Sequence, residues 1–426
     1  MNNNNQPPLT GVTVAELCVA IAGPAASGLL GDYGANIIKI EQPQAKNRGG
    51  NSILAGIPKL SNYDDSPQFY QDNRNKKSVI LDLHDKIDCD AFEKILSKSD
   101  VYISNLRNGA LEKLGPYGYT PEQVLKRHPH IVATIMTGYG RKGPDVNKPG
   151  YEGSGFWARS TLAYQHSGSH NGETYPPIIG SGVGDHTTAL AAVGGICAAL
   201  FSAKMTGKGR IVETSLLRAG MYTQGWAISN TFARRLKNKG DFRPFDREKM
   251  ANPLYGVYKA KNAMFFFIMP DSQRFWKRFC QGMDMGFDGN DKRFATAKDR
   301  RINYSILQKI IEDKLMTKTF EEWEKIFNKY DLWYQKVQTY DDLIQDPMAQ
   351  PGFTEIPRSS LDIDEGVEKI VTVSPPVDFD GEKHRTRDPV PIPGFHTAEV
   401  LKHVGLNQNE IEIIMSKNKM LTKPKL

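Results

Sequence analysis

The segment GVTVAELCVAIAGPAASGLLGDYGANIIKIE, residues 11–41, carries the pattern that decides the fold. Two runs rich in apolar and β-branched residues, 12–19 and 36–41, are each typical of a buried strand. Between them, Pro24 suits the first turn of a helix that continues through residues 25–35. The segment therefore predicts a strand, a helix and a second strand that lies parallel to the first.

The same alternation continues along the next hundred residues. The runs 78–83, 101–106 and 130–137 are rich in β-branched and apolar residues and predict three further strands. Residues 88–99 have the apolar spacing of an amphipathic helix. Strands that alternate with helices in this way form parallel sheets, so we expect an α/β fold with a Rossmann-like, parallel-sheet large domain.

A second composition begins after a long apolar stretch. From Asp185 to Gly207 the apolar residues recur at helical spacing, which predicts a long buried helix with a glycine C-cap. Residues 225–250 are polar and basic, as expected of a linker or an exposed crossover. Residues 256–269 then predict two strands joined by a turn, and helical patterns follow them. This part is expected to form a small α+β domain.

These patterns predict a two-domain organisation. A chain of 426 residues exceeds what one hydrophobic core usually organises. We place the N-terminal part of the large domain at 8–225 and the small α+β domain at 226–340. Residues 341–426 are expected to return to the large domain, ending in a predicted helix at 396–406.

Composition limits the classes of function. The chain is 39% hydrophobic and has no run near the roughly 18 consecutive apolar residues of a membrane helix, so no membrane partner is expected. Its net charge of +7 is scattered along the chain, which argues against nucleic acid and favours an anionic small ligand. The N-terminus has no targeting pattern and the four cysteines lie far apart, so we expect a cytoplasmic protein without disulfides.

Two local patterns suggest cofactor sites, and each lacks the context that such a site needs. Gly138, Gly140 and Gly143 follow a predicted strand as a GxGxxG string, but a polar loop comes next where a nucleotide site requires a helix. A glycine-rich turn is therefore expected. His166 and His170 lie four residues apart in a Ser/Gly-rich loop without a third ligand, so no metal site is expected.

Asp185 is the carboxylate with the most informative position. It follows a Gly-Val-Gly string and precedes the long apolar helix, so its carboxylate is suited to capping the helix N-terminus. The same position also suits a nucleophile, because a glycine-flanked turn is open to a substrate and the helix N-terminus stabilises negative charge. The residues alone leave both interpretations open.

Several longer strings resemble one known family. Each is similar to the corresponding segment of the family III CoA-transferases, and they occur in the expected order. Together they cover most of residues 9–225 and the C-terminal tail. The strings are residues 11–43, 73–83, 103–115, 137–152, 176–210 and 394–406.

The resemblance implies a covalent mechanism with Asp185 as the nucleophile. Asp185 would attack an acyl-CoA thioester to give a mixed anhydride, and the released CoA thiolate would then form an enzyme–CoA thioester. An incoming acid would reverse these steps and leave as acyl-CoA. Glu152 would support the nucleophile. CoA is thus a substrate, and no permanently bound cofactor is implied.

The resemblance also implies contacts to CoA from four segments. They are the first strand–helix turn, the end of the third strand, the loop after the fourth strand, and the loop over the pantetheine. Lys113 stands where the family has a basic residue for the nucleotide phosphates. The implied CoA-binding residues are Ala20, Ile21, Ala22, Leu81, Asn105, Leu106, Arg107, Lys113, Lys148 and Tyr151.

Departures from the family pattern narrow the expected activity. Ile21 stands where oxalate-type members have glutamine, which argues against oxalate or formate. Tyr151 and Glu152 stand where related racemases have a His-Asp pair, so a racemase would lack its base. The strings at 156–160 and 252–261 resemble members that act on 2-hydroxy acids and their enoyl or aryl relatives.

We therefore expect a transferase that moves CoA from an acyl-CoA donor to a carboxylic acid. The resemblance implies an interlocked homodimer in which each ring-like chain threads the other. An acyl-CoA racemase and a non-catalytic CoA-binding relative are the alternatives. The sequence does not identify the donor and acceptor acids.

Overall fold

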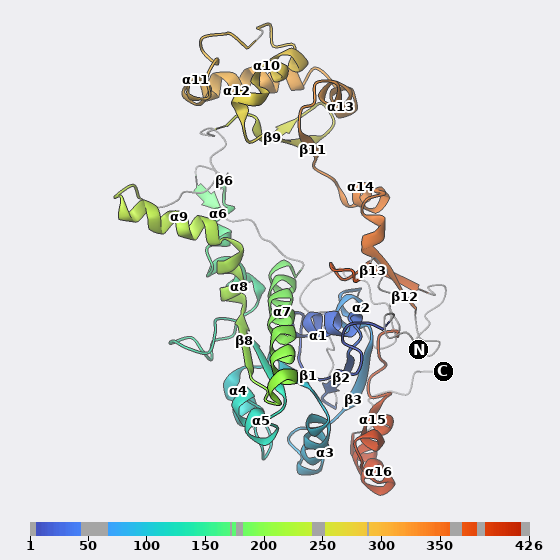
Figure 1. The fold of residues 1–426 in the computed structure, drawn as a ribbon. Helices are drawn as coiled ribbons and strands as arrows, with labels where there is room; N and C mark the ends of the chain where they lie inside the picture. The colour runs from blue at the N-terminus through green and yellow to red at the C-terminus, as the bar shows by residue number, and fades with distance from the viewer. Residues whose placement is uncertain are drawn as a thin grey trace. The chain divides into compact units, whose positions relative to one another are not determined.

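The structure is a computed structural model of the chain. It describes residues 6–43, 67–170, 173–175, 182–240, 252–287, 289–357, 369–380 and 388–418. The chain divides into two compact units, each drawn in Figure 1. The first comprises Met1–Phe242 with Pro351–Leu426, and the second comprises Arg243–Gln350. The sequence alone places these boundaries after residues 225 and 340.

A six-stranded parallel sheet forms the centre of the first unit. The strand order is β3-β2-β1-β4-β5-β8, and every neighbouring pair is parallel. This is the order of a Rossmann-like fold, as the sequence predicts. The strands are β1 (Thr13–Leu17), β2 (Asn36–Glu41), β3 (Lys76–Ile80), β4 (Val101–Ser104), β5 (Val132–Thr137) and β8 (Ile211–Ser215).

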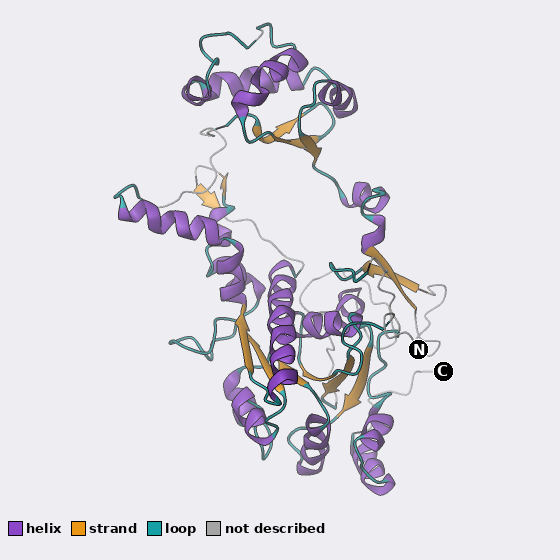
Figure 2. Ribbon diagram, in the orientation of Figure 1, coloured by secondary structure: helices purple, strands orange, loops and turns teal. Residues whose placement is uncertain are grey.

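Helices cover both faces of this sheet (Figure 2). α1 (Ala22–Asp32) and α7 (Val183–Thr206) share one hydrophobic cluster with one face of the strands. Four helices cover the opposite face, and the last two of them come from the C-terminal part of the chain. The four are α3 (Lys86–Ser97), α5 (Pro121–Arg127), α15 (Thr397–His403) and α16 (Gln408–Lys417).

α7 and α1 lie on the same face although their connections run in opposite directions along the sheet. The α1 connection leads from β1 to β2, whereas the α7 connection leads from β5 outward to β8. Two such crossovers on one face have opposite hands. The β1-α1-β2 crossover is right-handed, as is usual for parallel strands, and the β5-α7-β8 crossover is left-handed. The unusual α7 crossover places α7 against α1, with its first residues near the carboxyl end of β1.

α7 is the one helix in the described part of the chain whose length and apolar composition suffice to cross a membrane. The sequence rule based on consecutive apolar residues does not detect it, because threonines and small residues interrupt the run. One side, including Ala192 and Ile196, packs against α1 and the sheet. The other side exposes Leu190, Phe201 and Met205.

A network of buried charges fixes β1, β2 and β3 beneath α1. Glu16 is fully buried, and its carboxylate lies 2.7 Å from Nζ of Lys39 and 2.9 Å from Nζ of Lys76. Burial by itself would raise the pKa of Glu16, but the two lysines outweigh it and lower this pKa to about 2. β3 begins at Lys76, two residues before the predicted strand. The ion pair with Glu16 allows this lysine to lie inside the sheet.

The second unit has the α+β composition that the sequence predicts. Its antiparallel sheet has the order β11-β10-β9, and β9 and β10 form the predicted hairpin. Phenylalanines of β10 pack against aromatic residues of the helices. The elements are β9 (Tyr255–Lys259), β10 (Met264–Ile268), β11 (Tyr334–Lys336), α10 (Ser272–Met283), α11 (Ala297–Ile302), α12 (Tyr304–Leu315), α13 (Phe320–Lys329) and α14 (Tyr340–Gln345).

Shorter elements complete the first unit. One of them, α9, is a regular helix where the sequence predicts a linker, and none of its residues is buried. The remaining elements are α2 (Pro67–Asn73), α4 (Asn108–Glu112), a π-helical turn (Gly153–Ala158), α6 (Leu162–Gln165), β6 (Gly168–His170), β7 (Glu173–Tyr175), α8 (Leu216–Thr223), α9 (Gly225–Leu236), a 3₁₀ turn (Gln350–Gly352), β12 (Phe353–Pro357) and β13 (Lys369–Val373).

Candidate active site

The strand order reverses between β1 and β4, and the loops that leave these two strands form the start of the site. In open parallel sheets, ligands bind at the carboxyl ends of the strands where the order reverses. Asn105 joins the two loops, because its Oδ1 accepts from the Val19 amide at 2.9 Å and its Nδ2 donates to the Val19 carbonyl at 2.6 Å. Ala20, which follows Val19, has a left-handed φ of 58°, and this conformation turns the chain sharply into α1.

The beginning of α7 lies against this first turn. A Cβ built on Gly182 would lie 3.6 Å from Cγ2 of Ile21 and 3.2 Å from the His186 ring. Gly182 also has a φ of 76°, a conformation that favours glycine. α7 therefore begins beside Ile21, which places Asp185 at the same end of the sheet as Ala20 and Asn105.

Asp185 does not cap α7, which corrects the capping role suggested by the sequence. The N-cap is Gly182, and Asp185 lies within the first helical turn. At this position a carboxylate can reach back to the amide of the N-cap residue, as Asp299 and Asp342 do in α11 and α14, but Asp185 makes no such hydrogen bond within the described residues. Among the described residues, no hydrogen bond engages the Asp185 carboxylate, so it is available to react.

Glu152 supplies the cap in place of Asp185. Its Oε1 accepts from the backbone amide of Gly184 at 2.8 Å and from Nε1 of Trp157 at 3.0 Å. A negative charge at this position also interacts favourably with the helix N-terminus. Glu152 thus fixes the first turn of α7, and the supporting role in catalysis that the resemblance implies stays a prediction.

Glycines allow the loop that carries Glu152 to pack closely. A Cβ on Gly138 would lie 2.7 Å from Cα of Gly150, so the two backbones are in direct contact. Gly140 and Gly143 have left-handed φ angles near 100°, and no helix starts within the glycine run, which confirms the predicted glycine-rich turn. The π-helical turn then places the Phe156 ring against Gly184, where a Cβ would lie 2.4 Å from the ring.

Electrostatics at Asp185 differ from those of a surface carboxylate. Burial raises the pKa of Asp185 to about 7, Glu152 adds to the rise, and His186 opposes it. A carboxylate with this pKa is partly ionised at neutral pH and is more basic than an ordinary aspartate. These properties suit a nucleophile that must attack a carbonyl carbon.

His186 and Asp72 are parts of the site that the sequence analysis missed. Nε2 of His186 lies 3.0 Å from Oδ1 of Asp72, which is buried. The hydrogen bond to Asp72 raises the pKa of His186 and burial opposes this rise. The two residues are 114 positions apart, so spacing gives no signal for the pair. The adjacency of His186 to Asp185 was the only available indication.

The residues implied to bind CoA fall into different environments. Ile21 and Asn105 are partly exposed at the turn, whereas Ala22 is buried at the start of α1. Leu81 is fully buried in the core on the α3 face, so its side chain packs against that core, and its implied contact with CoA stays a prediction. Its alternating position in an extended segment directs it inward.

The remaining implied contacts lie on the loops beyond β4 and β5. Leu106 is packed against the α3-side core. The other four residues, Arg107, Lys113, Lys148 and Tyr151, are exposed. Within the described residues, none of the three cations among these four forms an ion pair. Arg107 and Lys113 flank α4, and a Cβ on Gly109 in α4 would lie 3.3 Å from Asn147 of the loop that carries Lys148. The geometry thus places α4 beside that loop.

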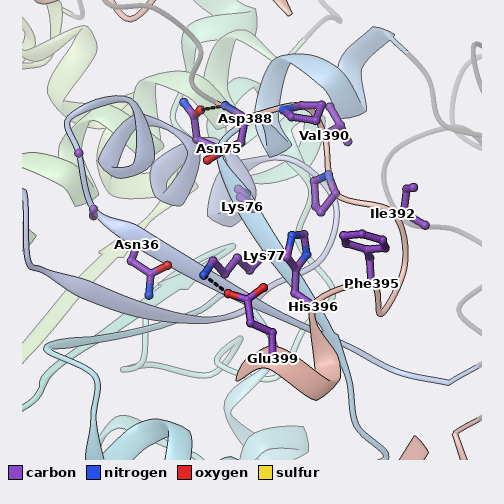
Figure 3. Close-up of a pocket in the computed structure, with 14 residues that line it drawn as sticks. Asn36, Asn75, Lys76, Lys77, Asp388, Val390, Ile392, Phe395, His396 and Glu399 are labelled. Atoms are coloured by element: carbon purple, nitrogen blue, oxygen red, sulfur yellow. Dashed lines mark hydrogen bonds and ion pairs between the residues drawn. The ribbon is translucent and has the colours of Figure 1, made fainter. Parts of the chain in front are cut away.

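A separate cavity of about 370 Å³ lies at the opposite, amino-terminal edge of the sheet. Figure 3 shows that Lys77 and Glu399 meet there as an ion pair, close to His396. Its lining residues Asn36 and Lys76 are the first residues of β2 and β3, whereas Asp185 lies near the carboxyl ends. The cavity is therefore distinct from the site around Asp185. No cluster of three His, Cys, Asp or Glu suited to a metal occurs among the described residues.

Comparisons with known proteins agree with this geometry. The chain is 31% identical over 405 residues to the (R)-2-hydroxy-4-methylpentanoate CoA-transferase of Clostridioides difficile, covering 95% of this chain and 97% of that protein. It is 32% identical over 416 residues to the cinnamoyl-CoA:phenyllactate CoA-transferase of Clostridium sporogenes, covering 96% of each. A CAIB/BAIF family protein from Brucella suis has a similar fold, with a TM-score of 0.76, 22% identity and coverage of 94% of this chain and 100% of that one. The profile of CoA-transferase family III matches residues 9–397, and the chain belongs to this family.

Proposed function

We propose that this enzyme transfers CoA from an acyl-CoA donor to a 2-hydroxy, enoyl or aryl carboxylic acid, with Asp185 as the covalent nucleophile. The observation that carries the proposal is the free Asp185 carboxylate in the first turn of α7, beside the carboxyl ends of β1 and β4. Its raised pKa supports this role, because a more basic carboxylate is a stronger nucleophile.

In the proposed reaction, an oxygen of Asp185 attacks the thioester carbonyl, the C–S bond breaks, and CoA leaves as a thiolate. The thiolate then attacks the aspartyl carbonyl of the anhydride, which releases the donor acid and leaves an enzyme–CoA thioester. The acceptor carboxylate attacks this thioester and releases the thiolate again. Attack of the thiolate on the new acyl carbonyl gives acyl-CoA and restores Asp185. Each covalent intermediate keeps one carbonyl group activated, as an anhydride or as a thioester.

The exposed cations of the loops support binding of the nucleotide part of CoA. Arg107, Lys113 and Lys148 are exposed and free of ion pairs within the described residues. A phosphate can therefore be paired without breaking an existing salt bridge, and charge-assisted contacts of this type are among the stronger hydrogen bonds. We propose these three residues as the phosphate-binding group.

The choice of acids rests on the relatives. Two of them, at 31% and 32% identity, are named for 2-hydroxy-4-methylpentanoate and for cinnamoyl-CoA with phenyllactate. Ile21, beside the start of α7, presents an apolar side chain to the region of the nucleophile. An apolar acyl group suits this surface better than a second carboxylate does.

The test is to incubate the protein with cinnamoyl-CoA in the presence of hydroxylamine and to map the modified peptides by mass spectrometry. We expect an aspartyl hydroxamate at Asp185, CoA transfer to phenyllactate, and loss of both in Asp185→Asn. Asp313→Asn, on the exposed surface of α12, is the matched control and should keep full activity.

Labelling at another residue, or full transfer by Asp185→Asn, would contradict the proposed nucleophile. A racemase gives a different result, because it exchanges the α-proton of an acyl-CoA with solvent when no acceptor acid is present. Such exchange without CoA transfer would replace the proposed function with an isomerase activity. Binding of CoA with neither reaction would indicate a non-catalytic relative.

We further propose that the protein acts as an interlocked homodimer in the cytoplasm. The exposed apolar residues of α7, α8 and α9 support a subunit interface, because monomeric proteins rarely expose large apolar patches. Within the described residues no disulfide joins the four cysteines, which fits a reducing compartment.

A further inference from the structure

Asp72 and His186 form a pair beside the nucleophile that the covalent steps do not themselves require. His186 follows Asp185 in α7, and its Nε2 lies 3.0 Å from Oδ1 of Asp72 in α2. Asp72 is only 5% exposed, and a buried carboxylate is costly unless a hydrogen-bonded cation accompanies it. His186 is the partner within reach that can supply this charge.

Glycines hold the pair in place from two sides. A Cβ on Gly28 of α1 would lie 2.8 Å from the Asp72 carbonyl oxygen, so this glycine lets α2 approach α1 closely. A Cβ on Gly182 would lie 3.2 Å from Nδ1 and Cε1 of His186, so the ring packs against the start of α7. The backbone thus fixes both partners, and the imidazole remains next to Asp185.

Three carboxylates and one imidazole share this region. Asp185 interacts with Glu152 from the loop after β5, with Asp72 from α2 and with His186. Lys76 also acts on Asp72, but its Nζ lies 2.9 Å from Glu16, and Lys76 is not among the charged groups that act on Asp185. Without a positive His186, Asp185 would face two carboxylates with no cation of its own.

We propose that Asp72 and His186 are positioning residues that keep the Asp185 carboxylate ionised at neutral pH. Asp72 holds a proton on His186, and the resulting imidazolium offsets the repulsion between Asp185 and its two carboxylate neighbours. This inference rests on the proposed role of Asp185 as the nucleophile. The pair does not touch the reacting bond in this scheme and acts through the charge on Asp185.

The proposal predicts an unusual order between two variants. His186→Gln removes the cation and leaves Asp72 unpaired, so the pH above which acyl-CoA reacts should rise. A rise of about one pH unit lowers the rate about tenfold on the acidic side and leaves the alkaline rate unchanged. The double variant Asp72→Asn with His186→Gln removes the repelling charge as well, so it should react faster at acidic pH than His186→Gln alone.

The measurement is kcat/KM for cinnamoyl-CoA between about pH 6 and about pH 9, a range that brackets the Asp185 pKa of about 7. His403→Gln, on the exposed side of α15, is the matched control and should leave the profile unchanged. A merely structural pair would give losses that are equal at all pH values and larger in the double variant. That result would overturn the proposal.

A second readout does not depend on activity. The imidazole of His186 can be titrated by NMR in protein labelled with ¹⁵N-histidine. Asp72→Asn should lower the pKa of His186, because its hydrogen bond to a carboxylate is lost. An unchanged titration would contradict the pairing. If the pairing holds but Asp185 is never acylated in the unaltered protein, the proposed function fails while the Asp72–His186 interaction remains established.

Discussion

The side chain of Asp185 links reactivity to stability. Its folded-state pKa of about 7 lies above the ordinary value of 3.8, mainly because of burial. Between these two pH values the folded state binds more protons than the unfolded state, so stability falls as pH rises through this window. The ionised nucleophile is therefore a source of instability at the pH where it is reactive.

Asp185→Asn should remove this cost. We expect the variant to be more stable than the unaltered protein by roughly 2 kcal/mol near pH 8, less than the full shift implies because water reaches the site. Near pH 4 the advantage should be much smaller, since Asp185 is then protonated in the folded state. Melting temperatures at the two pH values test this, with Asp313→Asn as a control. If Asp185→Asn raised the melting temperature equally at both pH values, ionisation of Asp185 would not be the cause of the added stability.

At the same scale, sequence reasoning identified Asp185 and Glu152 but not Asp72 or His186. A resemblance transfers residues only where strings match, and it does not report which distant side chains meet. It also could not show that Glu152, 32 positions earlier, caps the helix while Asp185 stays free. Leu81 was assigned a contact from its position in a string, although its side chain points into the core.

Among the elements, the contact between α7 and the π-helical turn controls where Asp185 lies. Gly184→Ala would place a Cβ 2.4 Å from Cγ of Phe156, a buried ring. We expect a loss of roughly 1–3 kcal/mol in stability from overpacking, together with a larger loss in acyl transfer, because the first turn of α7 must move. Thermal melting and the rate of hydroxamate formation measure the two effects.

Phe156→Leu provides the partner for a double-mutant test. If steric contact is the cause, Gly184→Ala combined with Phe156→Leu should be more stable than the two separate losses predict, since the smaller side chain leaves room. Additive losses would mean that Gly184 is needed for another reason, such as backbone freedom in the first turn.

Element prediction succeeded where burial dictates the sequence pattern. β1, β2, β4 and β5 lie within the predicted runs because both faces of this sheet are covered, so most of their residues are apolar or β-branched. α9 was missed because it buries nothing in its own chain and because the polar, basic residues around it resemble a linker, although Ile228, Phe232 and Leu236 recur at helical spacing. The hand of the α7 crossover leaves no local signal in the sequence, because it depends on which face a distant helix covers.

At the scale of the whole molecule, exposed apolar side chains gather on three consecutive helices. Trp226 is 90% exposed and Leu236 is 87% exposed, both in α9. A dimer that buries them would have a mass of about twice 47.6 kDa. The other members of the group, in α7 to α9, are Leu190, Phe201, Met205, Met221, Tyr222 and Phe232.

Trp226→Glu combined with Leu236→Glu should prevent this assembly, because buried unpaired carboxylates are costly at an interface. Sedimentation analysis is expected to show a dimer for the unaltered protein and a monomer for this variant. Ile302→Glu, an equally apolar-to-charged change on exposed α11, should leave the dimer intact. A monomeric unaltered protein that binds lipid vesicles would contradict the dimer and indicate that α7 meets a membrane.

The return of the C-terminal segment to the first unit also sets the order of events during synthesis. Leu401 and Ile414, in α15 and α16, are fully buried against the sheet and α3, and Thr397 accepts a hydrogen bond from the backbone of Ile80. A nascent chain still lacking these helices has its strands in place but one face uncovered. The second unit, by contrast, is complete once residue 350 has emerged. The second unit can therefore fold before α15 and α16 have been synthesised, and the uncovered sheet face of the first unit must be protected from aggregation until those helices emerge.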